Sequence, residues 1–353
     1  MANPATITDV PKTFCVMMQK DERFLLAPWI AYHGYLFGFQ NLCVLDNGSE
    51  SPDVLNTLAQ AEAKGVRVVW HWRSRADYLA KGEIVGTLLQ ALDTRKIYDF
   101  LMPLDCDEFV VLRTPGSFDC SREAVLDYLT TLMGAGRPFR FPYQLANHPL
   151  YPDLYHNFEF FKVFFAAGAA SPIDHGSHQA SGWPAEEIPD SHLIHLHFHH
   201  KIFDVKRAEA RRGWVGTADP DRPEDLAGYT GPSAHLNRFF LESREDYYRG
   251  FEDTVHFFLP RFRALLAKLG APLDLPAEDP PDSFRPEVIG SDDDGVLALI
   301  PKSRSVRFHE THYLAANPDL VAAAVDPTLH FCEHGFREQR PLRPKPKTGR
   351  DHG

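Results

Sequence analysis

Short apolar runs alternate with helical segments over the first hundred residues of the chain. The runs have the length and composition of β-strands, and they lie at residues 14–18, 42–45, 66–72 and 100–104. The segments between them have helical spacing, which is typical of βαβ units because parallel strands need a long crossover. Helices cover both faces of such a sheet. We therefore expect an α/β, Rossmann-like fold with a mostly parallel sheet and helices on both faces.

Composition narrows the class of protein. The chain has 353 residues, 44% of them hydrophobic, which is enough for one large domain and an appendage. A net charge of −11 argues against general nucleic-acid binding, which needs a basic face. The five cysteines are widely spread, so a reducing compartment fits better than a disulfide framework. With no signal-peptide pattern, we expect a cytoplasmic protein, and peripheral contact with the inner face of the membrane stays open.

Polar clusters follow three of the predicted strands, at residues 19–22, 46–49 and 105–107. In open α/β sheets, ligands bind beyond the carboxyl ends of the strands. No GxGxxG follows the first strand and no GxxxxGK[ST] occurs, so neither a dinucleotide fold nor a P-loop is supported. The pattern instead indicates a nucleotide fold that holds a diphosphate with a metal ion.

Two carboxylates, Asp105 and Asp107, follow the fourth strand with one residue between them. Carboxylate oxygens suit Mg²⁺ or Mn²⁺, and the oxygens of a diphosphate can complete the coordination shell. A solvated strand end is the alternative. For Glu108 we expect a role in holding the loop rather than the metal.

The stretch at residues 17–51, together with DCDEF at 105–109, resembles the GT-A glycosyltransferases. More narrowly, it is similar to their family 2-like and family 92-like group. In that group the first strand is followed by an (N/K)-(N/D)-E…W-I-x-Y-H…G-(F/V) segment, then by DNxS, and by DxDEF after the fourth strand. The resemblance implies a GT-A fold that binds a nucleotide-sugar donor.

Carried over to this chain, the resemblance implies that Asp46 contacts the nucleoside base or ribose. It also implies that Asp105 and Asp107 hold the metal and the donor diphosphate, with Glu22 near the nucleotide. Lys162 resembles the lysine of the family's K-(S/V)-I strand and is expected near the phosphates. Without the resemblance, Asp46 fits a simple turn and Lys162 a surface lysine.

Histidine and apolar residues alternate over residues 194–199. Such alternation predicts a strand with His195, His197 and His199 on one face. These three histidines would span about 13 Å, which is too far for one ion to bind them all. A separate zinc site and a purely structural histidine strand stay open as alternatives.

Family 92-like members carry an H-Y-R-x-K run in this region. Aligning residues 197–201 with that run implies that His197 completes the Mn²⁺ or Mg²⁺ site, although His199 replaces the arginine. His178 lies in a segment that resembles the family's G-x-H and is the second choice for a metal ligand.

A glycosyl transfer that inverts configuration needs a general base to deprotonate the acceptor hydroxyl. In the family 2-like pattern this base is a carboxylate well downstream of DxD. Glu186, Glu187 and Asp190 lie in that region, and Asp174 competes with them. The sequence does not separate these four, and a solvated loop is the alternative for each.

Aromatic residues are frequent at positions 137–163, where they suit either a carbohydrate site or a core.

Composition also divides the chain into segments. We expect a GT-A domain at 1–270, a Pro/Asp-rich linker at 271–294, a small helical module at 295–341 and a basic, disordered tail at 342–353. The module resembles one found in bacterial envelope and secreted proteins. Its function stays open.

These features together predict a metal-dependent, hexosyltransferase-type glycosyltransferase. It would move a sugar from a nucleotide-sugar donor, with a UDP-sugar expected, to a saccharide or lipid-linked acceptor in bacterial envelope or exopolysaccharide synthesis. One alternative is a nucleotidyltransferase of related fold, which would carry a glycine-rich loop after the first strand. The other is a non-catalytic protein that binds carbohydrate or metal. Sugar, acceptor, linkage and stereochemistry are not specified by the sequence.

Overall fold

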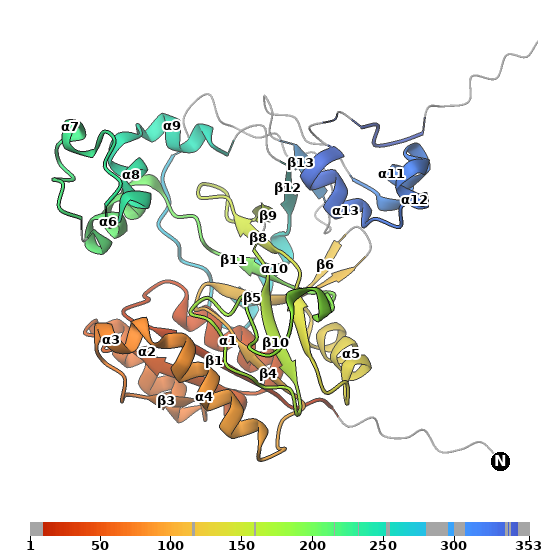
Figure 1. Cartoon of the computed structure of the whole chain (residues 1–353), viewed down its shortest axis with the longest axis horizontal. Coiled ribbons are helices and arrows are strands. Elements are labelled where there is room, and N and C mark those ends of the chain that lie inside the picture. Colours follow the sequence, from red (N-terminus) through yellow and green to blue (C-terminus); the bar gives the residue numbers. More distant parts are fainter. Residues whose placement is uncertain are drawn as a thin grey trace, which may run out of the picture. The chain divides into compact units, whose positions relative to one another are not determined.

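The chain is organised as two compact units in the computed structural model (Figure 1). The first comprises Met1–Leu145, Phe158–His197 and Arg261–Asp274. The structure describes residues 10–114, 117–158, 160–214, 216–231, 233–251, 255–279, 296–299, 308–335, 338 and 340–344. The predicted linker from residue 280 onward and the predicted tail from residue 345 onward lie outside these ranges. Within them, no helix is long and apolar enough to cross a membrane.

A six-stranded sheet forms the centre of the first unit, in the order β3-β2-β1-β4-β10-β7. Strand β1 pairs in parallel with both β2 and β4, β2 pairs in parallel with β3, and β10 runs antiparallel to β4 and β7. The strands are β1 (Thr13–Gln19), β2 (Leu42–Asp46), β3 (Arg67–Val69), β4 (Phe100–Pro103), β7 (Pro138–Phe141) and β10 (Lys162–Ala166). All residues of β1 are buried, as expected for a central strand covered on both faces.

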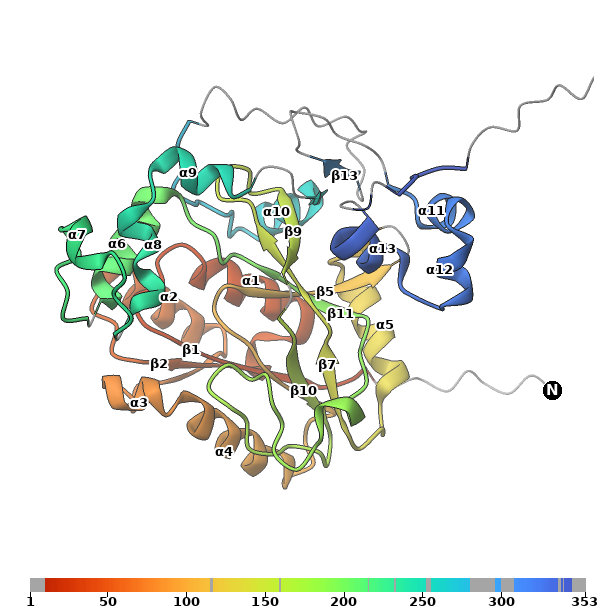
Figure 2. The same cartoon turned by 45° about the horizontal axis from the view of Figure 1, so that its top comes forward.

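Helices cover both faces of this sheet, as the sequence predicted. Figure 2 shows α1 and α2 on one side of β1 and β2, and α3 and α4 on the other. Val85 and Leu89 of α4 pack against Phe14 and Val16, which alternate with residues facing the opposite layer. The helices are α1 (Leu26–Phe37), α2 (Pro52–Ala63), α3 (Arg75–Leu79), α4 (Lys81–Asp93), α5 (Arg122–Leu132) and α10 (Pro260–Lys268).

Two predicted strands are shorter than expected. The run at 66–72 forms a strand only over β3, because β3 is the edge strand and the chain turns away at the exposed Trp70. The run at 194–199 is β11 (Leu193–His197), which ends where its partner β5 (Glu108–Thr114) begins, with His197 opposite Glu108. We had expected His195, His197 and His199 to share one face of this strand. The prediction is wrong for His199, because the strand ends at His197. Strands β6 (Ser117–Asp119) and β8 (Gln144–Asn147) flank this pair in the order β8-β11-β5-β6.

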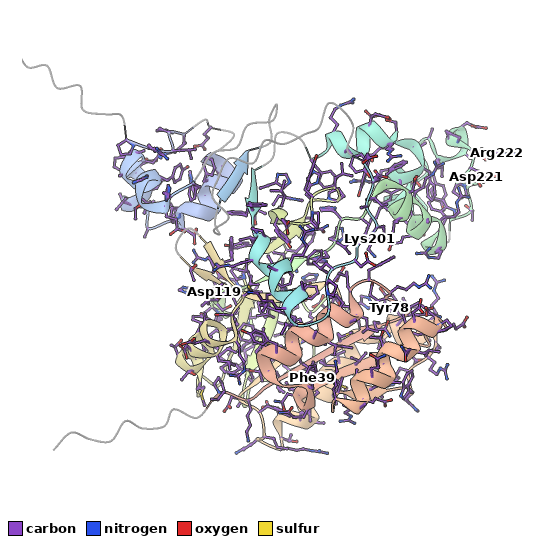
Figure 3. All side chains as sticks on the ribbon, turned by 180° about the vertical axis from the view of Figure 1, so that it is seen from behind. Phe39, Tyr78, Asp119, Lys201, Asp221 and Arg222 are labelled. Atoms are coloured by element: carbon purple, nitrogen blue, oxygen red, sulfur yellow. The ribbon has the colours of Figure 1, made fainter. Side chains whose placement is uncertain are left out.

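The second unit comprises Ala146–Asn157, Phe198–Pro260 and Leu275–Gly353. Its helices pack around aromatic residues that include Phe203, Phe240 and Tyr248. Arg211 of α6 forms an ion pair with Asp221, and its Nη1 lies 2.7 Å from Oδ2 of the aspartate. Figure 3 shows Asp221 on the loop that precedes α7. The elements of this part are β9 (Leu154–Phe158), α6 (Phe203–Gly213), α7 (Pro223–Leu226), α8 (Arg238–Leu241), α9 (Arg244–Arg249), β12 (Val255–Phe258) and β13 (Val296–Leu299).

The described part of the predicted C-terminal module contains strand β13 and, after it, a group of short helices. They are α11 (Glu310–Ala316), α12 (Pro318–Ala322), α13 (Pro327–His330) and the π-helix η4 (Phe331–Gly335). The buried Tyr313 packs against the rings of Phe308 and Phe331, and its hydroxyl lies 3.0 Å from Nδ1 of His330. Aromatic packing therefore holds this small group of helices together.

Four histidine rings, those of His148, His156, His200 and His256, cluster in the second unit. Ring centroids are 5.3 Å apart for His148 and His256 and for His156 and His256, and 5.2 Å apart for His156 and His200. Burial, followed by the neighbouring histidines, holds the pKa of His148 well below its ordinary value. Burial also lowers the pKa of His156 to about 4. Both rings are therefore neutral at pH 7.

We expect the free energy of unfolding to fall as the pH drops from roughly 6.5 toward 4. Histidines of the unfolded chain take up a proton near pH 6.5, whereas His156 of the folded protein stays neutral down to about pH 4. Between these pH values the unfolded state therefore binds more protons. Urea unfolding at several pH values measures this slope. His156→Phe should reduce the slope, and His71→Asn, at an exposed position, should leave it unchanged. An unchanged slope in His156→Phe would contradict the account.

Candidate active site

The loop after β2 is closed around the carboxylate of Asp46. This carboxylate is buried and accepts hydrogen bonds from the Gln19 side chain at 2.7 Å and the Ser49 hydroxyl at 2.5 Å. The backbone N–H groups of Gly48 and Ser49 also donate to it, at 3.1 and 2.9 Å. Gly48 has a φ of 78°, and a Cβ there would lie 2.8 Å from the carbonyl oxygen of Arg73. Asp46 thus shapes the loop and ties it to the end of β1.

The loop after β1 is held in a similar way. Glu22 accepts hydrogen bonds from the backbone N–H groups of Phe24 and Leu25, just before α1, at 3.1 and 3.2 Å. Asp21, with a φ of 52°, accepts from the backbone of Glu50 and Ser51 at 2.8 Å each. The carboxyl ends of β1 and β2 therefore form one cross-linked rim at the edge of the sheet.

Two lysines converge on Asp105, just beyond β4. Lys81 Nζ, from the first turn of α4, lies 2.8 Å from Oδ1, and Lys162 Nζ, from the start of β10, bonds Oδ2. Lys162 Nζ also lies 2.7 Å from Oε1 of the buried Glu108. Burial alone would raise the pKa of Asp105, but Lys162 and Lys81 outweigh it and hold that pKa below its ordinary value. Burial would likewise lower the pKa of Lys162, but Asp105 and Glu108 raise it, so the lysine is a cation at neutral pH.

Asp107 and His197, ninety residues apart in sequence, meet beside this cluster. Oδ2 of Asp107 lies 3.3 Å from Nε2 of His197, because the β5–β11 register places His197 opposite Glu108. Burial would raise the pKa of Asp107, but the imidazole outweighs it and lowers the pKa to about 2. Burial alone would lower the pKa of His197, but Asp107 outweighs burial and raises this pKa above its ordinary value.

Gln144, at the start of β8, connects the two groups. Its Nε2 lies 3.0 Å from Oε1 of Glu108, and its Oε1 lies 2.6 Å from Nδ1 of His197. A carboxylate only accepts, so the amide must present N–H to Glu108 and oxygen to His197. Nδ1 of His197 therefore carries a hydrogen, and Nε2 is the nitrogen directed at Asp107. Second partners of this kind fix the tautomer of a histidine that binds metal.

Sequence reasoning missed Gln144 and Lys81. No local pattern marks Gln144, whose role depends on strands far apart in the chain. Lys81 carried a weak signal, because a cation in the first turn of a helix opposes the helix dipole and so suggests a nearby anion.

Asp107 and His197 fit two positions in the shell of one divalent ion. Two ligands about 2.1 Å from an ion and at right angles to each other are about 3 Å apart, close to the 3.3 Å observed here. No group of three or more His, Cys, Asp or Glu residues is arranged to hold a metal within the described ranges. Substrate oxygens and water would have to supply the other ligands. Both oxygens of Asp105 are paired with lysines.

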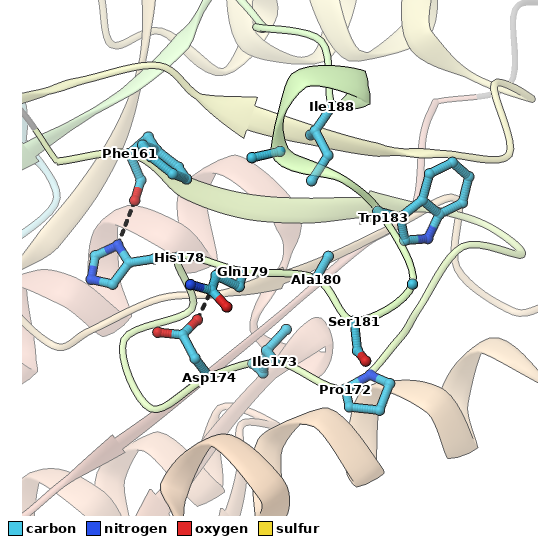
Figure 4. Close-up of a pocket in the computed structure, with 12 residues that line it drawn as sticks. Phe161, Pro172, Ile173, Asp174, His178, Gln179, Ala180, Ser181, Trp183 and Ile188 are labelled. Carbon is cyan, nitrogen blue, oxygen red and sulfur yellow. Dashed lines mark hydrogen bonds between the residues drawn. The ribbon is translucent and has the colours of Figure 1, made fainter.

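The remaining predicted residues lie elsewhere in the first unit. His195 is buried in the core, 3.9 Å from Glu108, and burial is the main cause that lowers its pKa to about 4. His178 lies at a separate pocket, where its Nδ1 is 2.5 Å from the carbonyl oxygen of Phe161 (Figure 4). Glu186 and Glu187 are exposed on the 3-10 turn η2 (Ala185–Glu187). Asp190 is exposed and pairs with Arg140 at 2.8 Å.

Comparison with known proteins finds several weakly similar structures. No protein-family model matches the chain, and no curated protein matches it significantly. Glucosyl-3-phosphoglycerate synthase from Mycobacterium tuberculosis is 23% identical over 39% of this chain and 43% of its own, with a TM-score of 0.22. A cytidylyltransferase from Leptospira borgpetersenii is 13% identical over 44% and 61%, with a TM-score of 0.24. TarS from S. aureus is 8% identical over 65% and 42%, with a TM-score of 0.28.

These alignments span less than two thirds of each of the three matched chains. All three TM-scores lie below 0.5. What this chain does must therefore follow from its own residues.

We expect Gln144→Leu to weaken Mn²⁺ binding by about 10- to 100-fold, because loss of a second partner frees the ring of a ligating histidine. In the metal-free protein, ¹⁵N NMR at a pH where His197 is neutral should show the ring losing its preference for the Nδ1–H form. Gln60→Leu, at an exposed position on α2, is the matched control. A His197 tautomer that is the same in Gln144→Leu and in the unsubstituted protein would contradict the positioning role.

Proposed function

We propose that the chain is a metal-dependent glycosyltransferase of the GT-A type. It moves a sugar from a nucleotide-sugar donor, with a UDP-sugar expected, to a saccharide or lipid-linked acceptor. The observation that carries the proposal is the Asp107–His197 pair, which lies beyond the end of β4, next to the half-buried Lys81 and the buried Lys162. A metal ligand pair beside two cations is suited to a diphosphate.

Charge balance favours a metal requirement. Asp105, Asp107 and Glu108 contribute three negative charges, Lys81 and Lys162 contribute two positive ones, and His197, whose pKa Asp107 raises, adds a third when protonated, so the cluster has no excess of positive charge. A diphosphate would add further negative charge. It is therefore expected to bind together with a divalent cation rather than alone.

Each residue has a proposed task. Asp107 and His197 hold Mn²⁺ or Mg²⁺. His178, the second choice from the sequence, is the alternative metal ligand. Asp105 holds Lys81 and Lys162 in position to meet the phosphates, and it becomes a metal ligand if these lysines move to the donor. The bound cation would offset charge on the departing nucleoside diphosphate.

The rim formed by the β1 and β2 loops is the proposed nucleoside site. Asp46 and Glu22 hold the shape of this rim through their hydrogen bonds to backbone N–H groups. Both oxygens of Asp46 already accept two hydrogen bonds each, so a contact with the base or ribose would have to replace one of these bonds.

The general base is proposed among the carboxylates of the loop before β11. Asp190 is paired with Arg140 at 2.8 Å, and Asp174 accepts backbone hydrogen bonds at 2.7 and 3.2 Å, so both carboxylates are already engaged. Glu186 and Glu187 are exposed on their turn and are the better candidates.

Bacterial envelope or exopolysaccharide synthesis, in the cytoplasm or at the inner face of the membrane, is the proposed setting. Its support is the sequence resemblance.

We expect UDP to bind in the presence of Mn²⁺ and at least about tenfold more weakly when the metal is removed with EDTA. Asp107→Ala should remove this metal dependence and the hydrolysis of the donor, because one of the two ligand atoms is lost. Isothermal titration and a donor-hydrolysis assay measure the two effects. Asp127→Ala, exposed on α5, is the matched control. Metal-independent UDP binding, or full donor hydrolysis by Asp107→Ala, would count against the proposal.

The same samples test the alternative function, a nucleotidyltransferase of related fold. A nucleotidyltransferase would form UDP-sugar and pyrophosphate from UTP and a sugar 1-phosphate. We expect no such product.

A further inference from the structure

The loop between β10 and β11 encloses a pocket of about 540 Å³. The backbone of the loop fixes its shape, since Ile173 forms an antiparallel bridge with Ala180. Asp174 closes the turn between them by accepting hydrogen bonds from the N–H groups of Gly176 at 3.2 Å and Gln179 at 2.7 Å. The pocket therefore exists before any ligand binds, and its volume is typical of a small-molecule site.

Aromatic and aliphatic side chains line most of this pocket. Figure 4 shows the rings of Phe161 and Trp183 at its two ends. Ile173, Ala180 and Ile188 are buried in the core cluster of the first unit, against which Trp183 also packs. Rigid rings on a fixed floor offer flat apolar faces, and the C–H faces of a sugar pack well on such rings.

The polar groups of the pocket suit hydroxyl groups rather than charged ligands. Gln179 and Ser181 are exposed and bring an amide and a hydroxyl, and Asp174 brings a carboxylate. Among the described residues that line the pocket, none is a lysine or an arginine. The guanidinium of Arg140 lies over the ring of Phe161 at 5.5 Å, but it is paired with a carboxylate at 2.8 Å. The imidazole of His178 also lines the pocket, and its Nδ1 is engaged with the carbonyl oxygen of Phe161. A phosphate or carboxylate ligand would therefore meet the carboxylate of Asp174 without a lysine or arginine as its partner.

The pocket lies close in the chain to the proposed donor site. Phe161 immediately precedes Lys162, the lysine that bonds Asp105. Ring contacts run from His197 to Phe158 at 6.1 Å, from Phe158 to Phe160 at 4.9 Å, and from Phe160 to His178 at 6.0 Å.

The candidate bases also border the pocket. Glu186 and Glu187 lie between two residues that line it, Ala185 and Ile188.

We propose that this pocket binds an uncharged sugar ring, the acceptor end of a glycan, and that it discriminates against sugar phosphates and small acids. The acceptor assignment rests on the proposed function. The affinity of the pocket for an uncharged sugar does not, because it follows from the rings and from the lack of a lysine or arginine among the described residues that line the pocket.

The test is a titration of the full chain with methyl glycosides of glucose, galactose, mannose and N-acetylglucosamine, without donor or metal. Glucose 1-phosphate and glycerate 3-phosphate are the charged probes. We expect at least one neutral glycoside to bind, and both phosphates to bind at least about tenfold more weakly. Binding of a phosphate more tightly than of every neutral glycoside would overturn the proposal, and so would no glycoside binding.

Variants tie the binding to the pocket. Trp183→Ala should weaken the glycoside at least about tenfold because it removes the larger ring. Gln179→Ala, at an exposed position, should weaken it several-fold without a packing change, which keeps the test valid if Trp183→Ala does not fold. Trp70→Ala, at an exposed tryptophan outside the pocket, is the control. Undiminished binding in Gln179→Ala and in any folded Trp183→Ala would overturn the proposal.

Failure of the pocket and failure of the proposed function give different results. If glycosides bind but Mn²⁺-dependent UDP binding is absent, the pocket stands as a saccharide site and the transferase proposal fails. If UDP binds with Mn²⁺ but no glycoside binds, the pocket assignment fails and the donor site stands.

Discussion

The carboxylate of Glu108 is wholly buried, and the geometry of the site depends on how its charge is compensated. It accepts hydrogen bonds from the backbone N–H of Asp105 at 2.9 Å and the Gln144 amide at 3.0 Å, and Lys162 lies 2.7 Å away. A buried charge without such partners would be strongly destabilising. These bonds fix the turn after β4, place the ammonium group of Lys162 and orient the amide that faces His197. One buried anion thereby connects β4, β5, β8 and β10.

From this anion the site separates into two parts with different chemistry. Asp105 lies between two lysines, and Asp107 faces an imidazole. The first part presents cations, which suit the phosphate oxygens of a diphosphate. The second presents two ligand atoms for the metal ion that a diphosphate would bind together with. The pocket beside Phe161 differs from both, because rings line much of it and none of the described lining residues is a lysine or an arginine. Charged donor and uncharged acceptor would then bind to surfaces of opposite character within one unit.

Local periodicity was enough to predict the central strands and the helices on both faces. Residues 14–18, 42–45 and 100–104 form strands, since buried strands are continuous apolar runs. The ends of β3 and β11 were not predictable, because the position of an edge and the start of a partner strand set them. The sequence named Asp107 and His197, and the structure places them in contact. Gln144 acts only through contacts made in the folded chain, which no local pattern records.

The central claim is that Asp107 and His197 bind one divalent ion together with a nucleoside diphosphate. Electron spin-echo spectroscopy of the protein with Mn²⁺ and UDP tests it directly, because a nitrogen bound to Mn²⁺ gives a characteristic modulation. We expect the coupling of a single imidazole, altered by ¹⁵N-histidine labelling and lost in His197→Ala. Bound Mn²⁺ without nitrogen coupling, or coupling that persists in His197→Ala, would contradict the claim.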